Sequence, residues 1–216
     1  GTLQTTGSAW GWVEIADNAI VRAEGKLEGL TLEDTNGKFS MQGMTGELHW
    51  AASESAPVAA SYLAWNSGSA NGLSGGRTRI DFATRGRGFA LTKPARVPVF
   101  DGAIILDALS VASLGSPDTE LTFDGRIEPI SMPLLAKAFG WPELNGQLAG
   151  RIPGLTYRNR ELTVEGDLVA SVFDGQVVGR NFRLRDPLGP WPRLFADVTA
   201  RRLHLAPDTP TVSFGS

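Results

Sequence analysis

The feature of this chain that most restricts its fold is a two-residue alternation of apolar and polar side chains. From Leu162 to Val172 the even-numbered residues are apolar or glycine, and Thr163, Glu165 and Asp167 lie among the odd-numbered ones. A strand of that length spans about 35 Å. One apolar and one polar face are typical of a half-covered antiparallel sheet. The same alternation recurs in ranges 44–50, 121–128, 144–152, 182–185 and 194–201.

Helical patterns are nearly absent, and this favours strands joined by turns. The exception is Ser131–Phe139, in which Ser131 can cap a helix, Pro133 suits its first turn and Gly140 can end it. Glycine accounts for 26 of 216 residues, about 12% against a usual ~7%, which fits many turns and bulges. We therefore expect an all-β protein with an elongated, curved, mainly antiparallel sheet, shaped like a groove or a taco, and one short helix near 131–139.

A tetrapeptide repeat adds to this prediction. Val-Phe-Asp-Gly occurs at Val99–Gly102 and again, 73 residues later, at Val172–Gly175, and similar apolar runs follow both copies. Phe-Gly pairs close the copies at 139–140 and 214–215. Repeats build extended surfaces more often than single pockets. We expect residues 1–216 to be one β-rich fragment of a longer repeat protein, with a module boundary near 140–142 separating 25–141 from 142–216.

Composition excludes several classes of protein. The net charge is −3 and the pI about 5.5, so the chain as a whole lacks the basic footprint of a nucleic-acid-binding protein. Cysteine is absent, which rules out disulfides and thiolate metal sites. No apolar run approaches the ~18 residues of a membrane-spanning helix.

Catalytic motifs are weak. Gly72–Gly76 matches the Gly-x-Ser-x-Gly pattern around Ser74, but a strand rather than a helix is expected after it, and only His49 and His204 could serve as bases. Two histidines far apart in sequence make a poor metal site. We expect no catalytic residue, no metal and no cofactor. Six tryptophans leave a second interpretation open, a non-enzymatic β-sandwich for interaction or carbohydrate binding.

Four segments carry a family resemblance: 139–155, 162–168, 172–179 and 184–189, with their glycine-punctuated apolar spacings. In these the chain resembles the AsmA-like superfamily of Gram-negative envelope proteins, and within it the YdbH-like branch. The resemblance extends over roughly residues 25–216 and is best after residue 98. It implies a long sheet bent into a trough, whose apolar floor lets phospholipid acyl chains pass between inner and outer membranes.

The resemblance also implies a periplasmic location within an inner-membrane-anchored parent protein, whose other parts contact the membranes. The expected partner is a phospholipid or another acyl-chain ligand, and not nucleic acid. Alternating strands most often bury their apolar face in a closed sandwich or barrel, and composition does not distinguish such a core from an open groove. The resemblance is what favours the groove. The candidate groove-lining residues are Leu121, Phe123, Leu148, Ile152, Leu162, Val164, Leu168, Phe182, Leu184 and Leu194.

Overall fold

The computed structural model describes residues 3–70, 72–140, 145–172, 175–186 and 193–201. These residues form one sixteen-stranded sheet and one helix. The elements are β1 (Leu3–Ala16), β2 (Ala19–Asp34), β3 (Phe39–Ala51), β4 (Ser61–Trp65), β5 (Ser67–Ala70), β6 (Leu73–Gly75), β7 (Thr78–Arg85), β8 (Gly88–Leu91), β9 (Ala95–Val99), β10 (Gly102–Ala112), β11 (Glu120–Ser131), α1 (Met132–Phe139), β12 (Gln147–Arg158), β13 (Glu161–Val164), β14 (Leu168–Val172), β15 (Gly175–Arg185) and β16 (Arg193–Arg201).

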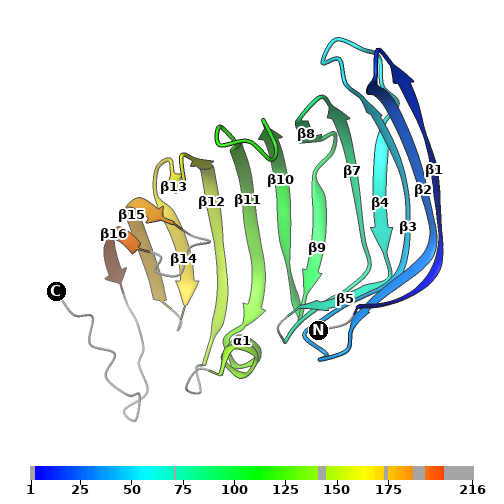
Figure 1. The fold of residues 1–216 in the computed structure, drawn as a ribbon. Helices are drawn as coiled ribbons and strands as arrows, with labels where there is room; N and C mark the ends of the chain where they lie inside the picture. The colour runs from blue at the N-terminus through cyan, green and yellow to red at the C-terminus, as the bar shows by residue number, and fades with distance from the viewer. Residues whose placement is uncertain (1–2, 71, 141–144, 173–174, 187–192, 202–216) are drawn as a thin grey trace.

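The sheet is a long antiparallel array that runs largely in sequence order from β1 at one edge to β16 at the other. One short parallel contact, Trp50 with Thr84, joins β3 to β7. Figure 1 shows that the strands curve along their length, most strongly in β1, β2 and β3, so the sheet has a concave and a convex face. The predicted all-β class, with a curved, mainly antiparallel sheet and one short helix, is confirmed.

Bulges in the middle of the strands accompany this curvature. In β2, β3 and β12 one extra residue lies beside Gly29, Gly43 and Gly154, whose φ angles are +61°, +63° and +52°. An extra residue inverts the alternation of side chains and bends the strand. The inversion keeps one face apolar across the bend: in β2 that face carries Leu27 before Gly29 and Leu30 after it.

The sequence repeat has a structural counterpart with the same offset of 73 residues. The three strands β8, β9 and β10 begin at residues 88, 95 and 102, while β13, β14 and β15 begin at 161, 168 and 175 and have the same lengths. The first and last residues of each tetrapeptide pair across antiparallel strands, Val99 with Gly102 and Val172 with Gly175. The Phe-Gly pair at 214–215 lies outside the described residues, as does most of the predicted boundary at 140–142.

The short helix supplies the main buried cluster. Met132 and Leu135 of α1 pack with Ile130 of β11, and all three are at most 7% exposed. Gly140 ends the helix in the left-handed conformation, as predicted. Ser131 occupies the N-cap position, but its hydroxyl donates to the Asp101 carboxylate and makes no cap hydrogen bond, so the predicted side-chain cap is wrong. The cluster is completed by Leu73, Val99, Phe100, Ile127 and Leu148.

Candidate functional site: the apolar concave face

A continuous row of apolar side chains crosses the sheet at right angles to the strands. Each member pairs with the next across neighbouring strands, and paired residues point to the same face. Ten spacings of about 4.8 Å give the row a contour of about 48 Å. Among its described side chains none is buried, and only Thr84 is neither apolar nor aromatic. The row consists of Val13, Ala23, Trp50, Thr84, Phe89, Val111, Leu121, Tyr157, Leu162, Leu184 and, by its backbone pairing alone, Leu194.

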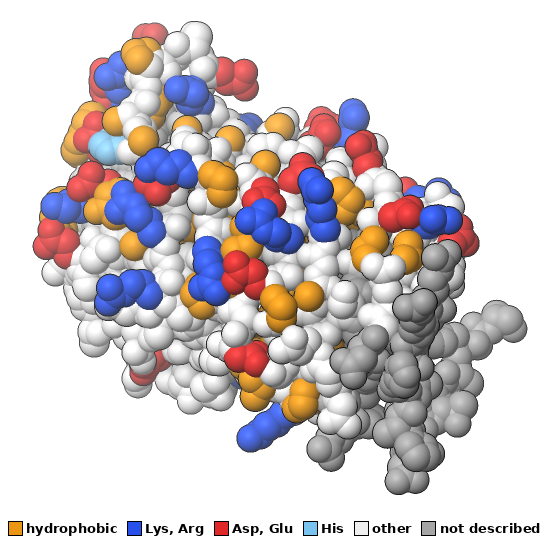
Figure 2. Space-filling model, turned by 180° about the vertical axis from the view of Figure 1, so that it is seen from behind, with side chains coloured by type: hydrophobic (Ala, Val, Ile, Leu, Met, Phe, Trp, Pro, Cys, Tyr) orange, Lys and Arg blue, Asp and Glu red, His pale blue; other side chains and the backbone are white. Residues whose placement is uncertain are grey.

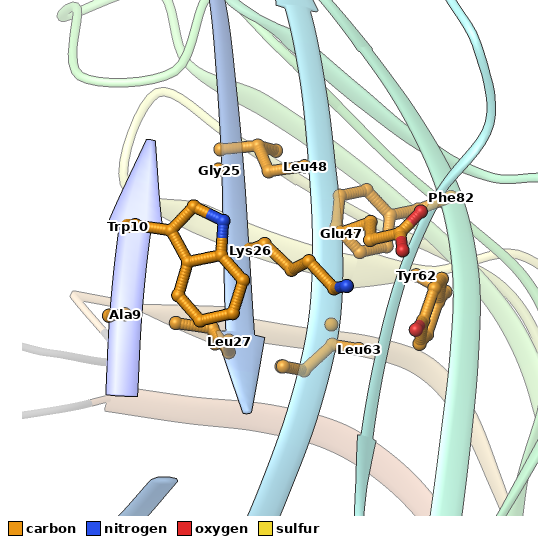
Figure 3. A pocket seen from close by; sticks show the side chains of 11 residues that line it. Ala9, Trp10, Gly25, Lys26, Leu27, Glu47, Leu48, Tyr62, Leu63 and Phe82 are labelled. Atoms are coloured by element: carbon orange, nitrogen blue, oxygen red, sulfur yellow. The ribbon is translucent and has the colours of Figure 1, made fainter. Parts of the chain in front are cut away.

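A hollow widens this face near β1, β2 and β3. It has a volume of about 440 Å³, and apolar side chains of Leu27, Leu48, Leu63 and Phe82 line it. Gly25 lies between them, where a Cβ atom would still be 3.8 Å from its nearest neighbour. The absent side chain therefore leaves space at the surface. Figure 3 shows the hollow together with Trp10, Lys26, Glu47 and Tyr62, which also border it. The side chains of these four residues point to the opposite face of the sheet, because side chains alternate along a strand.

Nine of the ten predicted lining residues fall into three groups, and Leu168 stands apart from them. Leu121, Leu162, Leu184 and Leu194 belong to the apolar row. Phe123 and Val164 both pair with Leu155, and these three residues form a second line of side chains next to the apolar row. Phe182 and Val164 line a second hollow in the sheet. Ile152 pairs with Gly125 beyond the bulge, and Leu148 packs against the α1 cluster. Leu168 pairs with Gly179, but the side chains of Leu168 and Leu194 lie outside the described part of the structure.

Sequence reasoning missed the N-terminal third of this face. Val13, Ala23 and Phe89 extend the row to the β1 edge, although none stood out by its spacing. The alternation of Leu48 and Trp50 was visible in the sequence and could have found part of it. The other members of this part of the row are brought together only by the register between strands that lie far apart in the sequence.

The convex face is charged. Ion pairs join strands there, with 2.6 Å between Arg126 of β11 and Asp107 of the neighbouring β10, and 2.7 Å between Arg96 of β9 and Glu128 of β11, across β10. Figure 2 views the molecule from behind and shows Lys, Arg, Asp and Glu side chains gathered over this side. In β7, hydrogen bonds from Arg79 lower the pKa of Asp81 below its usual value. Such exposed pairs add little stability, so their main consequence is one hydrated and one apolar face.

Two other interpretations can be compared with this geometry. Ser74 lies inside strand β6, and β7 rather than a helix follows it, so the strand-to-helix elbow of a serine hydrolase is not formed. His204, Trp141 and Trp191 lie outside the described residues. The β-sandwich alternative needs a second sheet, and the described residues form only one.

The described residues include no group of His, Asp and Glu side chains suited to a metal ion. They also include no helix that is long and apolar enough to cross a membrane.

Comparisons with protein-family models, curated protein sequences and solved structures gave no match for this chain.

Proposed function

We propose that this chain is a segment of an apolar β-groove that binds and conducts phospholipid acyl chains. The observation that carries the proposal is the apolar row, which is continuous by register from β1 to β16 and lies on the face opposite the ion pairs of Arg126 and Arg185. No second sheet of the described residues covers it. A compact protein would bury such a row in its core, whereas here its described side chains remain partly exposed.

An acyl chain needs no directional contact. Each methylene that leaves water contributes about 0.8 kcal/mol, wherever it lies on an apolar surface. A ligand held by such contacts can slide along the row, because each position is nearly equivalent to the next. The hydrocarbon core of a bilayer is about 30 Å thick, so one leaflet's acyl chain occupies about 15 Å. The contour of about 48 Å therefore accommodates the length of about three acyl chains.

The charged convex face suits a groove that runs through water. Its ion pairs, including Arg180 with Asp167 at 3.0 Å and Arg185 with Glu161 at 2.6 Å, keep that side solvated. A phospholipid would place its tails on the concave face and leave its headgroup in water at the rim. Together with the resemblance to the AsmA-like superfamily, this supports a periplasmic role between inner and outer membranes. The proposed activity is non-enzymatic, since sliding requires no bond to be made or broken.

Incubation with phospholipid vesicles tests the proposal. The purified chain is mixed with vesicles of phosphatidylethanolamine and phosphatidylglycerol, separated from them, and measured by native mass spectrometry with extraction of bound lipid. We expect protein–phospholipid complexes whose abundance falls when a free fatty acid competes. A protein that carries no lipid, and that does not bind a fluorescent fatty acid in solution either, would overturn the proposal.

A further inference from the structure

Two tryptophans lie on the charged face of the sheet, opposite the apolar row. Trp10 and Trp12 are alternate residues of the edge strand β1, so their indoles leave the same face about 7 Å apart. They are 51% and 50% exposed. Exposure of two indole rings to water is unfavourable, and exposed aromatic pairs of this kind often mark binding sites.

Polar side chains surround the two rings in a regular array. Lys26 pairs with Trp10 across the strands, and its Nζ atom lies 5.5 Å from the centre of an indole ring of Trp10. Glu24 pairs with Trp12, and its carboxylate lies 3.7 Å from His49 Nδ1. The carboxylate of Glu47 lies 4.0 Å from His49 Nε2. Together these groups line a hollow of about 240 Å³.

We propose that this hollow, the Trp10–Trp12 site, binds a pyranose saccharide. The C–H bonds on one side of a pyranose ring carry small positive charges and pack on the negative face of an indole. The carboxylates of Glu24 and Glu47 can accept hydrogen bonds from sugar hydroxyls, and Lys26 can donate to them. Aromatic rings beside a few convergent polar groups are the usual composition of a small-ligand site.

The charge of the site favours a saccharide over an anionic surface. Two carboxylates lie beside the rings, and Lys26 is paired with Glu28 at 3.1 Å, so little positive charge remains for phosphate. A membrane-binding surface would carry an excess of Lys and Arg next to its tryptophans. Neutral hydroxyls, which both donate and accept, match a mixed set of acids and bases.

The site is separate from the acyl-chain row. Val13, the β1 member of the row, points to the opposite face from Trp10 and Trp12 because side chains alternate along a strand. Saccharide binding therefore does not rest on the proposed lipid function, and either can fail alone.

NMR titration tests the proposal. The ¹⁵N-labelled chain is titrated with neutral hexasaccharides, namely β-1,4-linked glucose, β-1,4-linked N-acetylglucosamine and α-1,4-linked glucose, while the indole N–H signals are followed. We expect at least one of them to shift the signals that disappear in Trp10→Ala and Trp12→Ala. We expect Trp12→Ala to weaken binding at least tenfold and Glu24→Gln to weaken it several-fold, while Val13→Ala leaves it unchanged.

Three results would overturn the proposal. These are no shift at millimolar saccharide, a shift that is equal in Trp12→Ala and in the unchanged chain, or binding to lipid vesicles through Trp12 without any saccharide binding. Phospholipid binding by Trp12→Ala is measured in parallel and should be unchanged, so the two functions are judged separately.

Discussion

A carboxylate in the middle of the apolar row should interrupt acyl-chain binding. Leu121 pairs with Val111 on one side and with Tyr157 on the other, and its side chain is only half-buried. In Leu121→Asp a bound acyl chain loses contact with the Leu121 side chain, which extends over about two to three methylenes at about 0.8 kcal/mol each. An open trough covers about half of the surface of the acyl chain, so the loss of binding free energy is about 1 kcal/mol. That corresponds to about fivefold weaker binding. Burial of the charge under hydrocarbon adds to this value.

The matched control lies one residue away. Thr122 is exposed on the convex face of the same strand, so Thr122→Asp adds the same charge without touching the row. Displacement of a fluorescent fatty acid gives the affinities, and thermal unfolding checks that both variants remain folded. Leu121→Asp should bind at least about fivefold more weakly, and Thr122→Asp should bind within a factor of two of the unchanged chain. Equal losses in both variants, or no loss in Leu121→Asp, would refute the reasoning.

Three further predictions concern the scaffold. Gly125→Ala should lower the thermal unfolding midpoint because its Cβ would collide with the Ile105 carbonyl oxygen, whereas Gly25→Ala, with 3.8 Å of space, should not. Leu135→Ala should cost about 2–3 kcal/mol in urea unfolding, since it empties the α1 cluster; a cost below 1 kcal/mol would contradict that packing. Hydrogen bonds from Ser131 lower the pKa of Asp101 below its usual 3.8. The ionised Asp101 carboxylate therefore stabilises the fold fully at neutral pH, and this stabilisation fades as pH falls below 3.8. In Asp101→Asn the free energy of unfolding should depend less on pH in this acid range.

The class of fold could be predicted from sequence because alternation is a local property. Each alternating run shows its two faces within a few residues, and the helix at 132–139 is bounded by proline and glycine. The run Leu162–Val172, expected as one long strand, is divided between β13 and β14. The repeat was also visible, because equal strand lengths keep the same spacing in both copies.

The course of the apolar face could not be predicted as a whole. A bulge shifts the apolar positions, from odd to even at Gly43 and from even to odd at Gly154, so a single-period reading loses the face at each bend. Pairing between Trp50 and Thr84 depends on long-range register, which no local pattern reports. The hollow beside Gly25 arises from a missing side chain, and the sequence alone does not distinguish that glycine from one in a turn.

The location of a bound acyl chain tests the central claim most directly. A fatty acid with a photoreactive diazirine in its tail is bound to the chain, activated by light, and the modified residues are mapped by mass spectrometry. We predict labelling on the concave face, at Leu121, Tyr157 and Leu162 and at other members of the row. Labelling concentrated on convex residues such as Thr122 and Arg126, or spread equally over both faces, would contradict the account.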